Sequence, residues 1–267
     1  MNKSNWWSVV FVVVGMIAAA WYWQENEQQD RNLQPPPFTE AQPAPVTRAE
    51  PQIRHPIREA EPRAETKALP LLNESDAAMQ ETLTGFFGNK TVQEFFDLKD
   101  IVRRFAVTVD NLPRKKVPMR YRLFKPAAGQ FLATGEEQAL FFSRKNYSRY
   151  QAYVLLAEAV DAKKLVASYV HFYPLIQEEY KNLGYPSAYF NDRLVEAIDD
   201  LLAAPDVSGE IKLVRPNVLY QFADLELEAL SAGQKIMIRM GSENAARVKA
   251  RLREIRRELT APEKNNR

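Results

Sequence analysis

The feature that most constrains this chain is an uncharged, apolar run near its amino end. No charged residue lies between Lys3 and Glu25, and residues 6–23 carry all four tryptophans of the 267-residue chain, two at each end of the run. As a helix this run would be about 27 Å long, close to the ~30 Å hydrocarbon core of a bilayer. Tryptophan favours the membrane–water interface. The pattern predicts a single transmembrane helix over residues 6–23, preceded by a short stub over residues 1–5.

The charges that flank this run indicate how it is oriented. Lys3 and the amino terminus slightly outweigh Arg31, so the positive-inside rule favours a cytoplasmic stub with the rest of the chain across the membrane. The alternative is a cleavable signal peptide with residues 18–20, three alanines, as the cleavage site. The positively charged start of such a signal peptide would consist only of Lys3 and the amino terminus, and an aromatic cluster directly follows the three alanines. We therefore interpret the run as a retained, integral span.

The next segment, residues 24–72, has the composition of a tether. It holds nine of the chain's 17 prolines, no glycine, interspersed charges of both signs and a single aromatic residue, Phe38. Such a segment buries too little apolar surface to offset the entropy of ordering it. Proline without glycine makes it stiffer than a Gly/Ser tether. The composition predicts a disordered, semi-extended linker, and a Pro-rich ligand for a partner is the other interpretation.

The rest of the chain has the apolar periodicity of a mainly α protein with a small β-hairpin or short strands. Residues 73–241 are expected to form a helical soluble domain, and residues 242–267 a basic C-terminal helix and tail. Spacings of three and four predict helices, and alternation predicts strands. The helices are expected over 75–88, 91–112, 147–157, 161–183, 190–203, 225–240 and 242–259, and the strands over 119–123, 131–134, 139–142 and 211–214. Pro174 is expected to kink the buried helix over 161–183 or to start a new segment there.

The densest polar and aromatic cluster is predicted at a corner between two helices. Gly184 ends one helix and Ser187 or Asn191 starts the next, so Asn191 and Asp192 are expected to accept hydrogen bonds at a helix N-terminus. One interpretation is a capped corner with tyrosines packed over it. The other is a groove that offers tyrosine faces and a carboxylate to a sugar or a peptide. The candidate ligand-binding residues are Tyr185, Tyr189, Asn191, Asp192, Arg193 and Glu196.

Carboxylates recur along the helix that follows this corner. Asp192, Glu196, Asp199 and Asp200 lie opposite the apolar stripe, so they are expected on its solvated side. A pair of such acids is also what a glycoside hydrolase requires. A hydrolase or carbohydrate-binding protein that uses this corner is therefore the alternative to a purely binding role.

Other enzyme chemistry has little support in the composition. The chain has no cysteine, which excludes disulfides, thiolate zinc sites and a cysteine nucleophile, and it has only two histidines. His171 lies in the most apolar helix and is interpreted as a packed or pH-sensing residue. Neither a Gly-x-Ser-x-Gly elbow nor a glycine-rich phosphate loop is present. We predict no catalytic residue, no metal site and no cofactor.

Two basic patches remain as candidate contact surfaces. The first is a run without an intervening acid, and the second lies on the last helix, whose other interpretation is a solvated, ion-paired surface helix. Outside the membrane they would suit an anionic polymer, lipid headgroups or an acidic protein face, and in the opposite orientation nucleic acid. The patches comprise Arg114, Lys115, Lys116, Arg120, Arg122 and Lys125, and Arg247, Lys249, Arg251, Arg253, Arg256 and Arg257.

Several runs of sequence resemble a family of uncharacterised bacterial proteins with one N-terminal span, a Pro-rich linker and a helical domain of unknown function. These runs are residues 171–175, 184–194, 211–216, 227–236 and 244–249. The resemblance covers most of residues 73–257 and implies a bacterial inner-membrane setting with a periplasmic domain. It brings no activity and no catalytic residue. Together with the composition it predicts a membrane-anchored, non-enzymatic interaction or scaffolding module of the cell envelope, whose partner is an envelope protein or an anionic polymer rather than nucleic acid.

Overall fold

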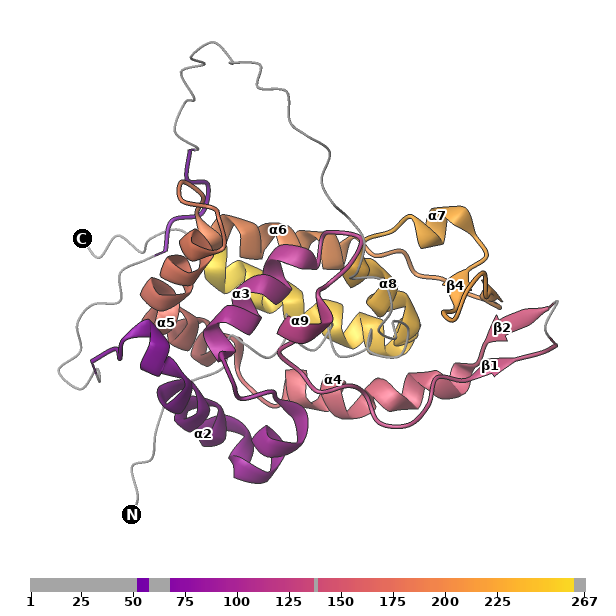
Figure 1. Ribbon diagram of the computed structural model, residues 1–267, viewed down its shortest axis with the longest axis horizontal. Coiled ribbons are helices and arrows are strands. Elements are labelled where there is room, and N and C mark those ends of the chain that lie inside the picture. The colour runs from indigo at the N-terminus through magenta and orange to yellow at the C-terminus, as the bar shows by residue number, and fades with distance from the viewer. Residues whose placement is uncertain (1–51, 58–67, 137–138, 262–267) are drawn as a thin grey trace, which may run out of the picture.

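The computed structural model describes residues 52–57, 68–136 and 139–261 (Figure 1). Most of the described chain is helical, with a small sheet set at one end of the helices. The helices are α2 (Ser75–Phe95), α3 (Ile101–Asn111), α4 (Gln151–Glu158), α5 (Ala162–Asn182), α6 (Phe190–Leu202), α7 (Leu225–Glu228), α8 (Ala232–Arg239) and α9 (Ser242–Thr260). Short 3-10 turns cover Leu72–Glu74, Met119–Tyr121 and Arg144–Tyr150. The predicted class, mainly α with short strands, is confirmed for this part of the chain.

The last helix, α9, lies in the middle of the bundle. It packs against α4, α5, α6 and α8, as Figure 1 shows for the yellow helix among its neighbours. Val248, Leu252, Ile255 and Leu259 recur at spacings of three and four and are all buried in the main core. One stripe of this helix thus faces the core that residues 73–241 also build, while its charged side chains form ion pairs, as the interpretation of an ion-paired surface helix expected.

The buried helix expected over residues 161–183 is confirmed as α5. Asp161 caps it by accepting hydrogen bonds from the main-chain N–H groups of Lys163 and Lys164, at 3.0 and 3.2 Å. Tyr169 and Ile176 are completely buried along it. Pro174 lies inside the helix, which continues to Asn182 without a second start. A new segment at Pro174 is thus not formed.

The strands form one antiparallel sheet in the order β1-β2-β3-β4. Strand β1 (Ala133–Thr134) pairs with β2 (Leu140–Phe142), which confirms the predicted hairpin. Strand β3 (Lys212–Val214) pairs with β2 and with β4 (Gln221–Phe222), a strand that the sequence pattern did not indicate. Phe142, Leu213 and Phe222 of the sheet form a second, smaller hydrophobic cluster together with Ile211 and with Ile238 of α8.

Gly88 (φ 76°, ψ 152°) breaks α2 into two helices, which confirms the predicted stop of the first helix there. Three of the expected elements differ from the structure. The alternating residues 119–123 begin with a 3-10 turn and not a strand. The helix expected over 91–112 is interrupted before α3, where Asp100 has a positive φ of 53°. The helix expected over 225–240 is divided in two, because Ser231 and Gln234 form a capping box that starts α8.

The predicted span over residues 6–23, the stub before it and much of the tether lie outside the described residues. Among the residues that the structure does describe, no helix combines the length and the apolar character needed to cross a membrane. Of residues 24–72, two pieces are described, residues 52–57 and residues 68–72. The first of these pieces contacts the predicted corner.

Candidate functional site: a corner that holds part of the tether

The corner lies between the end of α5 and the start of α6. Gly184 turns the chain with a φ of 101°, and Tyr189 occupies the N-cap position of α6 without a side-chain capping bond. Gln177 of α5 caps the helix instead: its Oε1 accepts from the N–H of Phe190 at 2.8 Å. Its Nε2 also donates to the carbonyl of Ala188 at 2.9 Å. The predicted capping role of Asn191 and Asp192 is therefore wrong, and their side chains are available for another contact.

Asn191, Asp192 and Tyr189 bind the main chain of residues 54–57. The two oxygens of Asp192 accept from the N–H groups of Arg54 and His55, at 3.0 and 2.7 Å. The Tyr189 hydroxyl accepts from the N–H of Ile57 at 2.6 Å, and Asn191 Nδ2 donates to the carbonyl of His55 at 2.8 Å. Figure 1 shows the indigo segment beside the turn between α5 and α6. A stretch of the predicted tether is thus docked on the predicted ligand-binding corner.

Buried groups beneath the docked segment hold the binding residues in place. Asn191 is completely buried, and its Oδ1 accepts from the Tyr169 hydroxyl at 3.0 Å. Burial raises the pKa of Tyr169 well above its usual range, so this hydroxyl stays protonated and remains a donor. The same cause raises the pKa of Tyr173, whose hydroxyl donates to Gln177 Oε1 at 2.8 Å. The corner is therefore preorganised by a network of neutral hydrogen bonds.

Two other candidate residues of the corner, Tyr185 and Arg193, contact Asp110 on α3. The carboxylate of Asp110 is almost fully buried and lies 3.1 Å from Arg193 Nε and 3.0 Å from Arg114 Nη2. The Tyr185 hydroxyl donates to the same carboxylate at 3.1 Å. Arg193 also pairs with Glu196 at 2.8 Å. The six predicted residues therefore form two groups, one that binds the tether segment and one that joins α6 and its preceding loop to α3.

The four carboxylates of α6 are held by different partners. Asp192 binds residues 54 and 55. Glu196 pairs with Arg193 and lies on the solvent-exposed side of the helix, as expected. Asp199 forms a two-point contact with Arg256 of α9, at 2.5 and 3.0 Å. Asp200 is half-buried and accepts from the Ser231 hydroxyl at 2.6 Å, and burial is the main cause that raises its pKa. The structure thus does not bring these acids together as a pair around one open site.

The first basic patch is largely occupied by tertiary contacts. Arg114 pairs with Asp110, Lys115 donates to the carbonyl of Ala229, and Lys125 donates to the carbonyl of Gln93. The guanidinium of Arg120 lies over the ring of Tyr121, 4.7 Å from its centroid. Lys116 and Arg122 also have interactions. This run therefore helps to hold α3 and the following loop in place, and it is not a uniform cationic surface.

The second basic patch is also used to pack α9 against its neighbours. Arg247 binds Glu158 of α4 at 2.8 Å, Arg256 binds Asp199 of α6, and Lys249 donates to the carbonyl of Ala204 at 2.5 Å. Arg251 pairs with Glu254 one turn along the same helix. Arg253 and Arg257 are exposed. The patch is therefore reduced to isolated exposed positions between ion pairs.

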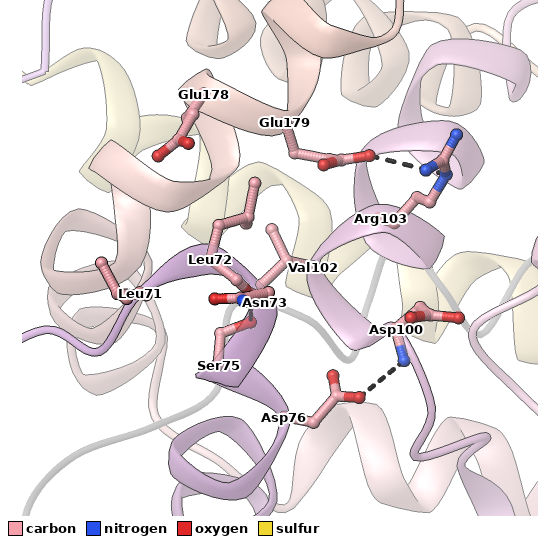
Figure 2. A pocket seen from close by; sticks show the side chains of 10 residues that line it. All are labelled: Leu71, Leu72, Asn73, Ser75, Asp76, Asp100, Val102, Arg103, Glu178 and Glu179. Carbon is pink, nitrogen blue, oxygen red and sulfur yellow. Dashed lines mark hydrogen bonds and ion pairs between the residues drawn. The ribbon is translucent and has the colours of Figure 1, made fainter.

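A hollow of about 440 Å³ lies between the start of α2, helix α3 and the C-terminal part of α5 (Figure 2). Asp76 lines it and accepts from the main-chain N–H groups of Asp100 and Ile101, both at 2.8 Å. Glu179 also lines it; this side chain is buried, 3.6 Å from Arg103 Nε, and burial is the main cause that raises its pKa. Sequence reasoning assigned no role to this hollow.

His171 is partly buried and its ring lies against that of Phe172, with centroids 4.8 Å apart. Burial lowers its pKa, so the packed imidazole is favoured in the neutral form. Within the described ranges, no group of three or more histidine and carboxylate side chains is arranged to hold a metal ion.

These features define a class of protein: a mainly helical domain that binds residues 54–57 of its own Pro-rich segment at a helix–helix corner. The chain matches a family described as a protein of unknown function (DUF3014) over residues 101–256, more than half its length, and it belongs to that family. The match confirms that the chain is part of a family without an assigned activity. No curated protein and no solved structure matches the chain.

Sequence reasoning missed three parts of this site. Asp110 and Gln177 lie among other polar residues of their helices, and nothing in their spacing distinguishes them from solvated positions. The docked segment had a local signal, because Ile53 and Ile57 are branched aliphatic residues within a stretch of prolines and charges. The overall composition of the tether concealed that signal.

Proposed function

We propose that this chain is a membrane-anchored, non-enzymatic interaction module of the bacterial cell envelope. The span over residues 6–23 would hold it in the inner membrane, and the helical domain would lie in the periplasm. The Trp-flanked apolar run, the Pro-rich tether and the sequence resemblance support this setting. The contact site of the module is the corner formed by Tyr189, Asn191 and Asp192.

The observation that carries the proposal is the set of four hydrogen bonds to the main chain of residues 54–57. Main-chain hydrogen bonds are a recurring source of affinity in peptide recognition. Recognition of main-chain N–H and carbonyl groups favours an envelope protein over an anionic polymer as the partner. The hydrolase alternative is disfavoured because the carboxylate of Asp192 already accepts two N–H groups and the other acids of α6 have partners of their own.

Crosslinking in intact cells tests this proposal. A photoreactive side chain replaces Ser187, an exposed residue beside the corner, and in a matched control it replaces Leu155, an exposed residue of α4. We expect one envelope protein to crosslink at position 187 and not at position 155. The crosslink should be lost with Asp192→Ala and kept with Glu196→Ala, which removes the same charge one turn away.

Two results would contradict the proposal. A reporter fused after residue 267 that is active only in the cytoplasm would exclude the periplasmic setting. Release of soluble fragments from purified cell wall, lost with Asp192→Ala or Glu196→Ala, would instead establish the hydrolase.

A further inference from the structure

We infer that residues 52–57 are an internal ligand that occupies a peptide-binding site, and that the outside ligand of this site is a peptide that adopts the same bent main chain, with proline before a branched aliphatic residue. This inference rests on the proposed function of the corner as a contact site. It names the chemical class of the partner and the way in which access to the site is controlled.

The bonds at the corner recognise main-chain groups and not side-chain identity. The N–H groups of Arg54, His55 and Ile57 are the donors, and the carbonyl of His55 is the acceptor. Pro56 has no main-chain N–H group, and none of the four bonds needs a donor at this position. A proline at this place is therefore tolerated by the site, and its fixed φ lowers the entropy lost when the peptide is ordered.

Side-chain selectivity is confined to two positions of the segment. Ile57 is partly buried and packs against the main core, and His55 is also partly buried. Residues 52–54 and Pro56 are exposed, so their side chains contribute little to recognition. The site thus selects a peptide whose main chain bends at the positions of Arg54 and His55, with an aliphatic residue at the position of Ile57, and it accepts proline directly before that residue.

The connection between the segment and the domain makes the segment a competitor. Residues 58–67 join Ile57 to the described chain that leads into α2. Covalent attachment within one chain gives a ligand an effective concentration that can reach the order of millimolar. An outside peptide binds only the fraction of molecules whose corner is open, so its apparent affinity falls by that fraction. The docked segment therefore restricts the site to partners that bind more tightly or are present at high local concentration.

A binding measurement on the full chain in detergent micelles tests the inference. The probe is a fluorescent peptide with the sequence of residues 50–59. Ile57→Asp weakens the internal ligand and leaves the corner unchanged, and Ile53→Asp is its matched control, because Ile53 is 51% exposed. We expect the Ile57→Asp chain to bind the probe at least about tenfold more tightly than the wild type or Ile53→Asp. Adding Asp192→Ala should abolish this gain, whereas adding Glu196→Ala should not.

Two modified probes test main-chain recognition directly. Methylation of the amide nitrogen at the His55 position removes a donor without changing any side chain, and we expect it to weaken binding at least about tenfold. Methylation at the Ile53 position is the control, because that N–H takes part in none of the four bonds, and it should leave binding unchanged. Equal loss with both probes would contradict recognition through the main chain.

The remaining outcomes also decide the question. Equal binding by the wild-type and Ile57→Asp chains would overturn the internal competitor. Failure of the opened chain to bind the probe, with an unchanged circular dichroism spectrum, would overturn the peptide site, while the crosslink at position 187 would still test the proposed function separately. If Ile57→Asp alters the spectrum, His55→Pro opens the site instead, because it removes one donor and leaves the core contact of Ile57 in place.

Discussion

At the scale of single residues, the corner depends most on Asp110. Its carboxylate joins the Arg193 guanidinium from α6, the Arg114 guanidinium and the Tyr185 hydroxyl, and it is shielded from water. Removal of one partner from a buried ion pair leaves the other charge uncompensated. Asp110→Ala should therefore lower the free energy of unfolding by about 3 kcal/mol, measured by urea denaturation of the full chain.

The matched control for this prediction is Asp199→Ala. Asp199 also pairs with an arginine, Arg256, but both side chains are more than one-third exposed. Because water screens such a pair, its loss should cost less than about 1 kcal/mol. Equal effects of the two substitutions would show that Asp110 has no special role.

Substitution by alanine should lower the stability of the fold at Gly241 and raise it at Gly85. Gly241 has a φ of 85°, and a Cβ there would lie 2.7 Å from the ring of Tyr147. Gly241→Ala should therefore destabilise the fold by about 2 kcal/mol. Gly85 lies within α2 with no atom near the added methyl group, so Gly85→Ala should stabilise it by about 0.5–1 kcal/mol. Thermal unfolding of both variants measures the difference, and a loss of stability in both would contradict it.

Glu179 should make stability depend on pH. Burial raises its pKa above the ordinary value of 4.5, against the smaller opposing effect of Arg103. The folded chain therefore holds this proton more tightly than the unfolded chain, and its stability falls as the pH rises from 4.5 through the raised value. Glu179→Gln should remove this part of the pH dependence and raise the free energy of unfolding at pH 7. The exposed neighbour substitution Glu178→Gln is the control, and a less stable Glu179→Gln chain at pH 7 would show that the ion pair with Arg103 dominates.

At the scale of elements, long amphipathic stripes could be predicted from sequence. The helices over 161–183, 190–203 and 242–259 were expected, since burial of an apolar stripe dominates their formation. Residues 119–123 were not predicted correctly, because the guanidinium of Arg104 binds the carbonyls of Arg120 and Arg122 and holds this segment beside α3. The start of α3 was missed for a similar reason. Asp76, distant in sequence, binds the first N–H groups of that helix, and local patterns carry no signal of such a contact.

In the candidate site, too, features with a local sequence signal could be predicted, and contacts between distant segments could not. Tyr189, Asn191 and Asp192 were expected at a helix corner because the density of polar and aromatic residues is a local property. Their ligand was not expected, because it lies far away in a segment whose overall composition is that of a tether. The supporting bond from Tyr169 to Asn191 also joins two helices and has no local signature.

The position of α9 gives a prediction at this scale. Leu252 is completely buried where α9 meets its neighbours, so Leu252→Ala should lower the free energy of unfolding by about 3 kcal/mol. Arg253→Ala, at the next and exposed position, should change it by no more than about 0.5 kcal/mol. Chemical denaturation of both variants makes the comparison, and a small effect of Leu252→Ala would mean that α9 is not part of the core.

At the scale of the whole molecule, docking of residues 52–57 sets the length of tether that remains between the proposed span and the domain. With the segment bound, residues 24–51 separate the span from the corner. After release, the tether also includes residues 52–67, which at about 3.5 Å per residue add up to about 55 Å to its maximum reach. Occupation of the corner and the reach of the domain from the membrane are therefore coupled in the proposed arrangement.

Limited proteolysis measures this release in the intact chain. Trypsin cleaves after arginine, and the bond between Arg54 and His55 is held at the corner because the N–H groups on both sides of it bind Asp192. The segment must leave the corner before a protease can bind it in an extended form, so the cleavage rate follows the open population. Asp192→Ala removes two hydrogen bonds and should accelerate cleavage after Arg54 at least about tenfold, as quantified by mass spectrometry. Glu196→Ala should leave the rate unchanged, and equal rates for the wild type and Asp192→Ala would mean that the corner does not retain the segment.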